Sequence, residues 1–238
     1  MKLFGLIGKN LTHSFSKKHF LNKFLIESIN DCEYKNFELR DISEFTKLIQ
    51  KNKMSGINVT IPYKKEIIPF LDELSKEAKL IGAVNTIQIK KNKLIGYNTD
   101  YIGFKNSISP LLYNKDKAMI LGNGGAANAV KYALKQLEID YIIISRQGKY
   151  RYADISKSMI TKYNVIINTT PLGSFPKFDN LPKIPYQYLK KSNFLYDLIY
   201  NPIKTKFLAS GVEKKCRIKN GLEMLEIQAE ESWKIWNL

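Results

Sequence analysis

A glycine-rich segment between a short apolar run and an amphipathic stretch constrains this sequence most strongly. The apolar run is Ala118–Leu121, and the next eight residues are Gly-Asn-Gly-Gly-Ala-Ala-Asn-Ala. Gly122 suits a tight turn, Gly124 lets the backbone approach an anion, and Ala127 stands where a small residue allows a helix to pack closely on a strand. A helix beginning near Gly125 would direct free N–H groups at that anion. The segment predicts a Rossmann-like unit that binds a dinucleotide pyrophosphate, although a plain strand-to-helix connection is the alternative.

The end of the next apolar run bears on which dinucleotide would bind. About 20 residues after the glycine turn, an NAD-binding unit usually carries an Asp or Glu for the ribose 2′-hydroxyl. Here the run Tyr141–Ile144 is followed by Ser145, Arg146 and Gln147. A guanidinium at this place suits a 2′-phosphate through charge-assisted hydrogen bonds, whereas a carboxylate would repel it. We therefore expect NADP rather than NAD, and the alternative for Arg146 is a solvated surface cation.

The composition is that of an ordinary globular protein. The chain has 238 residues, of which 44% are hydrophobic, and this length allows two modest domains. No run reaches the roughly 18 apolar residues that span a bilayer, and the apolar run at residues 3–7 is too short for a signal peptide. We expect a cytoplasmic protein with no membrane partner. Cys32 and Cys216 lie far apart without a Cys/His cluster, so neither a disulfide framework nor a metal site is predicted.

The formal net charge of +16 raises nucleic acid as a partner. However, the cations are mostly lysines that are spread along the chain in pairs, as at residues 17–18, 90–91 and 214–215. No segment concentrates them, so we expect no nucleic-acid partner. The charge would still attract small anionic ligands.

Alternating strand and helix patterns predict an α/β domain over the first hundred residues. Residues 67–81 repeat apolar side chains at helical spacing, with Asp72 as a start signal. Residues 83–89 and 94–97 indicate a hairpin that turns at residues 91–93. The remaining patterns are strands at 3–7, 34–39 and 56–60 and helices at 15–29 and 42–49.

A second α/β domain follows, and the boundary is expected near Tyr101. We predict that residues 1–101 form one domain, completed by the C-terminal segment 222–238, in which Leu222–Trp236 is an amphipathic helix that packs back on it. Residues 102–221 are predicted to form a Rossmann-like dinucleotide-binding domain. Four apolar runs supply its parallel strands: Ala118–Leu121, Tyr141–Ile144, Val165–Asn168 and 194–198.

Polar blocks follow the predicted strands, at the edge where an open α/β sheet binds its ligand. The blocks, which Gly-Leu-Ile-Gly at 5–8 precedes, are His-Ser-Phe-Ser at 13–16, Asn-Val-Thr-Ile-Pro-Tyr-Lys at 58–64, Gly-Ala-Val-Asn-Thr at 82–86, Asn-Thr-Asp at 98–100, Asn-Thr-Thr-Pro-Leu-Gly at 168–173, Tyr-Asp-Leu-Ile-Tyr-Asn-Pro at 196–202 and Asn-Gly-Leu-Glu-Met-Leu at 220–225. In order and spacing they resemble the shikimate dehydrogenase family from end to end. That resemblance implies an enzyme that uses NADPH to reduce 3-dehydroshikimate reversibly to shikimate, in the shikimate pathway of aromatic amino acid biosynthesis.

The resemblance implies a catalytic pair, Lys64 and Asp100. Hydride delivery to a carbonyl leaves an alkoxide, so a proton donor must stand beside that oxygen. Lys64 fits this role, with Asp100 as its ionic partner. Each residue also has a plainer explanation, because Lys64 belongs to a Lys-Lys pair in a lysine-rich chain and Asp100 could simply cap a helix.

The resemblance also implies residues that bind the substrate. Ser14 and Ser16 would donate hydroxyl groups to its carboxylate, although either could instead cap the following helix. Tyr200 would reach the same carboxylate. Gln228 would contribute only if the last helix folds back on the first domain. The ring hydroxyls would meet Thr60, Asn85, Asp100 and Gln228.

The implied cofactor site departs from the family pattern in two places. Asn123 stands where the family often has Ala, and Ser-Arg-Gln at 145–147 replaces the common Asn-Arg-Thr. Met224 would lie near the nicotinamide, but it could equally fill a core. The implied cofactor-binding residues are Gly122, Asn123, Gly124, Gly125, Ala126, Ser145, Arg146, Thr169, Gly221 and Met224.

Two other functions stay open at this point. An NAD-preferring quinate/shikimate dehydrogenase is the nearest enzyme, and the missing acidic residue at 145–147 argues against it. A non-catalytic basic binding protein with the same fold would account for the charge, but the intact Lys64, Asp100 and serine set argues against decay. We expect a small-molecule substrate, a monomer or homodimer, and structural rather than catalytic roles for His13 and His19.

Overall fold

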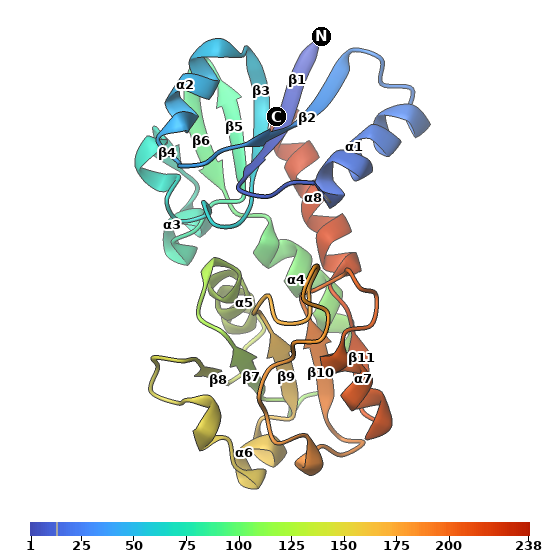
Figure 1. Ribbon diagram of the computed structural model, residues 1–238. Helices are drawn as coiled ribbons and strands as arrows, with labels where there is room; N and C mark the ends of the chain where they lie inside the picture. Colours follow the sequence, from blue (N-terminus) through green and yellow to red (C-terminus); the bar gives the residue numbers. More distant parts are fainter. Residues whose placement is uncertain (13) are drawn as a thin grey trace. The chain divides into compact units, whose positions relative to one another are not determined.

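The computed structural model describes residues 1–12 and 14–238, and these fall into two compact units. Unit 1 comprises residues 1–100 and 228–238, and unit 2 comprises residues 101–227. Each unit combines a β-sheet with α-helices, which confirms the predicted α/β class (Figure 1). Within the described ranges, no helix is long and apolar enough to cross a membrane.

Unit 1 is built on a mixed six-stranded sheet. The strands are β1 (Lys2–Gly8), β2 (Cys32–Glu38), β3 (Met54–Val59), β4 (Glu73–Leu74), β5 (Thr86–Lys90) and β6 (Lys93–Tyr97). Their order is β2-β1-β3-β5-β6-β4, and the antiparallel pairs are β3 with β5 and β5 with β6. The helical segments are α1 (Phe15–Ile26), α2 (Glu44–Lys51), η1 (Ile68–Phe70), α3 (Lys76–Ile81) and the end of α8 (Leu222–Trp236).

Both faces of this sheet are buried. Successive side chains of a strand point to opposite faces, so Ile7 packs with Phe45 of α2, whereas Phe4 packs with α1 and α8. The ring of Trp236 stacks on Phe4 at a centroid distance of 4.9 Å. Its Nε1 donates to the carbonyl of Ile87 on β5 at 3.0 Å. The end of the C-terminal helix therefore packs on the first sheet, as predicted, whereas its first residues, 222–227, group with unit 2.

The prediction of one helix over residues 67–81 is wrong. The segment forms η1, β4 and α3 in succession. Pro69 lacks an N–H and fits only the first turn of a helix, so it cannot stand inside a long one. Asp72 does not cap a helix, because its carboxylate accepts from the backbone N–H of Leu94 at 2.7 Å. The N-cap of α3 is Ser75, and pairing of β4 with β6 overrides the helical spacing.

Unit 2 is built on a five-stranded parallel sheet. Its strands are β7 (Ala118–Leu121), β8 (Tyr141–Ile144), β9 (Val165–Asn168), β10 (Phe194–Asp197) and β11 (Arg217–Lys219). The order is β11-β10-β9-β7-β8, so the chain moves from β7 to β8 on one side and returns to β9 on the other. Open sheets bind ligands at such a switch point. The helical segments are α4 (Asp100–Ile108), η2 (Ser109–Leu111), α5 (Gly125–Gln136), η3 (Tyr152–Asp154), α6 (Lys157–Lys162), η4 (Tyr186–Tyr188), α7 (Lys206–Glu213) and the start of α8.

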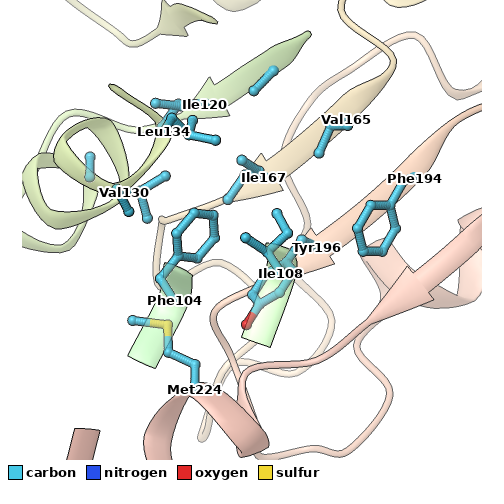
Figure 2. Packing of buried hydrophobic residues seen from close by; sticks show 13 residues of the cluster. Phe104, Ile108, Ile120, Val130, Leu134, Val165, Ile167, Phe194, Tyr196 and Met224 are labelled. Carbon is cyan, nitrogen blue, oxygen red and sulfur yellow. The ribbon is translucent and has the colours of Figure 1, made fainter. Parts of the chain in front are cut away.

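The two faces of the second sheet bury separate clusters. On one face Ile120 and Ile167 pack with Phe104 of α4, Val130 of α5 and Met224 of α8 (Figure 2). The opposite face carries a second cluster, which includes residues of α6 and α7. Strands buried on both faces are nearly continuous apolar runs, which is why β7 and β9 could be predicted with these bounds. The edge strand β8 is half-buried but is an equally continuous apolar run.

Candidate active site

Lys64 and Asp100 form an ion pair in unit 1. Nζ of Lys64 donates to Oδ2 of Asp100 at 2.6 Å, and their side chains are 18% and 7% exposed. Lys64 lies in the turn after β3, where its carbonyl accepts from the N–H of Val84 at 2.7 Å, and Asp100 begins α4. A pair this sheltered interacts more strongly than a surface pair. Lys64 is therefore not the solvated surface lysine of the plainer explanation.

The amide of Asn85 joins this pair to the C-terminal helix. Its Nδ2 lies 2.9 Å from Oδ1 of Asp100 and 3.1 Å from Oε1 of Gln228. It also lies 2.9 Å from the hydroxyl of Thr99, whose backbone N–H donates to Oδ1 of Asn85 at 2.7 Å. Two amide hydrogens are thus shared among three acceptors. The predicted residues Lys64, Asp100, Asn85 and Gln228 are brought together in one buried cluster.

A polar chain continues behind Gln228 through residues that the sequence analysis missed. The hydroxyl of Ser232 donates to the carbonyl of Gln228 at 2.9 Å and lies 2.7 Å from the hydroxyl of Thr86. Nδ2 of Asn58 donates to Ser232 at 3.0 Å, and the hydroxyl of Tyr34 donates to Oδ1 of Asn58 at 2.8 Å. Burial raises the pKa of Tyr34, which keeps it a neutral donor. The sequence held two signals for these residues. Asn58 and Thr86 stand in polar blocks, and Ser232 lies one helical turn after Gln228.

The two serines and Thr60 follow neighbouring strands of the first sheet. Ser14 caps α1 through its hydroxyl, and Ser16 is buried. Thr60 follows β3, and a Cβ at Gly8, the last residue of β1, would stand 2.6 Å from its methyl group. Since the chain leaves β1 for β2 on one side and β3 lies on the other, these residues border the switch point of this sheet.

Two neighbours of the cluster have structural contacts. The hydroxyl of Tyr63 donates to the carbonyl of Leu39 at 2.7 Å, so this side chain enters the core, where burial raises its pKa. His19 lies 2.9 Å from a carboxylate oxygen of Glu230, which joins α1 to α8. His13 lies outside the described residues. In the part of the chain that the structure describes, no group of His, Cys, Asp and Glu could hold a metal ion.

Gly122 allows the turn after β7 to meet the turn after β9. Its φ is +109°, and an added Cβ would stand 2.6 Å from the hydroxyl oxygen of Thr169. Both the N–H and the hydroxyl of Thr169 donate to the carbonyl of Leu121, at 3.0 and 2.7 Å. Gly122 is therefore required by its backbone conformation and by the close approach of Thr169 at the switch point.

The start of α5 has the features of an anion site. Gly124 is its N-cap without a side-chain cap, and a Cβ built there would meet nothing within 4 Å. Gly125 and Ala126 are the first two residues of this 12-residue helix. The first N–H groups of a helix have no intrahelical partner and carry its positive dipole end. The backbone of Gly124 is therefore open on the side where a Cβ would lie, which would let an anion approach the helix start, and the side chain of Asn123 is exposed.

The remaining predicted residues of unit 2 lie in other segments. Arg146 is exposed directly after Ser145 at the end of β8, so its guanidinium is accessible to an anion. Tyr200 is half-buried after β10. A Cβ at Gly221 would stand 2.1 Å from the carbonyl oxygen of Leu198, so only glycine fits there. Met224 is 7% exposed and packs in the core of Figure 2.

Comparison with known proteins gives a consistent result. The family model described as the shikimate dehydrogenase substrate binding domain matches residues 6–87. A shikimate dehydrogenase (NADP(+)) of Clostridium beijerinckii is 39% identical over 251 residues, which cover 99% of this chain and 92% of that protein. The solved shikimate dehydrogenase of Aquifex aeolicus is 34% identical, with a TM-score of 0.89 over 100% of this chain and 92% of that one. The Thermus thermophilus shikimate 5-dehydrogenase, solved with NADP(H) and shikimate, is 27% identical, with a TM-score of 0.87 over 99% of this chain and 93% of that one.

Proposed function

The chain belongs to the shikimate dehydrogenase family, and we propose that it catalyses the reversible, NADPH-dependent reduction of 3-dehydroshikimate to shikimate. The observation that carries this proposal is the sheltered ion pair of Lys64 and Asp100, to which Asn85 and Gln228 are joined by hydrogen bonds. A charged proton donor held beside polar groups suits the reduction of the carbonyl of a polyhydroxylated ring.

Lys64 is the proton donor of this reaction. When bound, NADPH would supply a hydride to the carbonyl carbon of the substrate. Negative charge then develops on the carbonyl oxygen, and Nζ of Lys64 gives that oxygen a proton; in the oxidative direction the Lys64 amine takes it back. Asp100, at 2.6 Å, orients the ammonium group before transfer and stabilises its charge.

The other polar residues of unit 1 hold the substrate. Asn85 and Gln228 bind ring hydroxyls, because side-chain amides both donate and accept, and the contact between them fixes their orientation. Asp100 and Thr60 act on the same hydroxyl groups. The substrate carboxylate is bound by the hydroxyl groups of Ser14 and Ser16, and we also assign Tyr200, which belongs to unit 2, to this carboxylate.

The turn after β7 holds the NADP pyrophosphate. Gly124, Gly125 and Ala126 supply backbone N–H groups, and the open side of Gly124 at the start of α5 supports this assignment. Arg146 and Ser145 bind the 2′-phosphate, and the absence of a carboxylate directly after β8 favours NADP over NAD. The rest of the cofactor is bound by Gly122, Asn123, Thr169, Gly221 and Met224.

The proposal also covers the roles of the two domains, the cellular location and the oligomeric state. Residues 1–101 with the C-terminal helix at 222–238 act as the substrate domain, and residues 102–221 act as the NADP domain. The division into two compact units supports two domains, with residue 101 and the first part of that helix, residues 222–227, grouped with unit 2. The enzyme works in the cytoplasm as a monomer or homodimer, without a nucleic-acid partner.

An absorbance assay of the purified protein tests the activity. Shikimate is supplied with NADP⁺ or NAD⁺, and quinate is run in parallel. We expect reduced nicotinamide to form fastest from shikimate with NADP⁺. Preference for NAD⁺ would contradict the role of Arg146, and no turnover of either substrate by folded protein would contradict the proposed reaction.

A further inference from the structure

A buried carboxylate, Asp197, lies at the carboxyl end of β10 in unit 2. Its side chain is inaccessible to solvent and accepts three hydrogen bonds, all from neutral donors. The hydroxyl of Thr205 lies at 2.6 Å, Nδ2 of Asn168 at 3.0 Å and the backbone N–H of Ile199 at 3.1 Å. A buried carboxylate without a cation is costly, so these donors must compensate for the water it has lost.

One donor connects Asp197 to the glycine turn. Oδ1 of Asn168 accepts from the N–H of Thr170 at 3.0 Å and from its hydroxyl at 2.6 Å. Thr169, which lies between them, bonds to the carbonyl of Leu121 directly before the turn. The carboxylate thus orients the Asn168 amide, and that amide fixes the loop after β9.

The other donors connect Asp197 to the loop after β10 and to α7. The N–H of Ile199 binds the carboxylate, and the carbonyl of Ile199 accepts from the N–H of Gly221 at 3.0 Å. Tyr200 is the next residue in this loop. Thr205 ends the loop as the N-cap of α7, where its hydroxyl also accepts from the N–H of Leu208 at 3.3 Å.

We propose that Asp197 is a positioning residue that fixes the ligand-binding rim of unit 2. The rim consists of the loops after β9 and β10, which carry Thr169 and Tyr200, and of Gly221, which bonds to the second loop. This inference rests on the proposed function, which assigns Thr169 and Gly221 to NADP and Tyr200 to the substrate. Its carboxylate accepts all three hydrogen bonds without donating one, whereas the amide of an isosteric asparagine would direct an N–H group at a donor. The loops that carry Thr169 and Tyr200 would then shift, while the N-terminus of α5 and the end of β8 keep their own backbone contacts.

The control is a second buried carboxylate of unit 2. Asp116 is 6% exposed and accepts from Nδ2 of Asn164 at 2.6 Å and from the N–H of Tyr113 at 2.9 Å. Unlike Asp197 it also has a cation nearby, because Nη2 of Arg217 lies 3.9 Å from its Oδ2. It lies shortly before β7, at the opposite end of the parallel strands. Asp116→Asn therefore reproduces the loss of a buried acceptor without touching the rim.

Calorimetric titration of the full chain with NADP⁺ and with 2′,5′-ADP tests the proposal. The second ligand has the adenosine and 2′-phosphate but no nicotinamide half. For Asp197→Asn we expect the NADP⁺ dissociation constant to rise about tenfold or more, and that of 2′,5′-ADP to change by less than about threefold. Asp116→Asn should leave both within about threefold of the parent protein. An unchanged NADP⁺ constant in Asp197→Asn, or an equal loss of both ligands, would overturn the positioning role.

A second pair of variants serves if Asp197→Asn does not fold. Thr205→Val removes the donor at 2.6 Å and should weaken NADP⁺ binding, and Thr205→Ser, which keeps the hydroxyl, should restore it. Equal NADP⁺ affinities in these two variants would refute the inference. If the parent protein itself bound no NADP⁺ and turned over no shikimate, the proposed function would fail instead.

Discussion

Ionisation of Asp197 should cost the folded protein about 3 kcal/mol. Burial raises the pKa of this carboxyl to about 6 from its usual 3.8, although the hydrogen bonds from Thr205, Ile199 and Asn168 oppose the rise. A difference of about 2 units between the folded and unfolded chains corresponds to about 3 kcal/mol of stability.

The sign of this effect follows from the proton that Asp197 binds. Between about pH 4 and pH 6 the folded protein keeps that proton, while the unfolded chain has released it. The contribution of Asp197 to the free energy of unfolding is therefore greatest below about pH 4. It is lost as the pH rises through about 6.

Urea unfolding of the parent protein and of Asp197→Asn, at steps from pH 4 to pH 8, measures the effect. The difference between the two unfolding free energies cancels the titration of the other groups. We expect the parent's advantage over the variant to shrink by about 2.5 kcal/mol between pH 4 and pH 7, because a small part of the effect is already lost at pH 4. Parallel profiles would show that the carboxyl titrates alike in the folded and unfolded chains, and would refute the burial argument.

Three substitutions test the proposed active site and the polar chain behind it. Lys64→Ala should lower kcat by about 10²-fold to 10⁴-fold and leave shikimate affinity within a few fold, and an unchanged kcat in the shikimate assay would remove Lys64 from the chemistry. Arg146→Gln should raise KM for NADP⁺ by about tenfold without affecting KM for NAD⁺, and equal effects on both cofactors would contradict a 2′-phosphate contact. Ser232→Ala alone should raise KM for shikimate several-fold, but the double variant with Gln228→Ala should have nearly the KM of Gln228→Ala alone. Additive effects would mean that Ser232 does not act through Gln228. Ser107→Ala is the control for Ser232, because this buried helix serine, which bonds to Tyr196, lies in unit 2.

The elements that could be predicted from the sequence are those whose pattern is local. β7, β8 and β9 are short, continuous apolar runs, and α5 begins directly after the glycine-rich turn that follows β7. The prediction of one helix over residues 67–81 was wrong because β4 forms only by pairing with β6, some 20 residues later. The first helix ends at Ile26 rather than at residue 29, because Ser28 adopts a φ of 54°. α7 and β11 were missed, since an 8-residue helix and a 3-residue strand give weak patterns.

Some residues of the candidate site could likewise be predicted from the sequence, and others could not. Lys64, Asp100 and Asn85 lie in compact blocks that the sequence displays directly, so their proximity could be predicted from the family resemblance. Ser232 could not be found in this way, because it lies outside every block and far in the sequence from its partner. Asp197 and Asn168 both stand in blocks, but the resemblance implies no role for either of them. Ser232 is 174 residues from Asn58, and Asp197 is 29 residues from Asn168.

Both buried polar clusters lie behind the carboxyl ends of parallel strands, next to the switch point of their own sheet. In unit 1, Asn58 on β3 supports Ser232 and so the helical turn that carries Gln228. In unit 2, Asp197 on β10 supports Asn168 and the loop that carries Thr169. A loop at a strand end has few apolar contacts of its own, so its conformation depends on such buried hydrogen bonds. Removing one acceptor from either cluster leaves the apolar core of that unit intact. It should therefore weaken ligand binding by more than the small loss of folding stability would suggest.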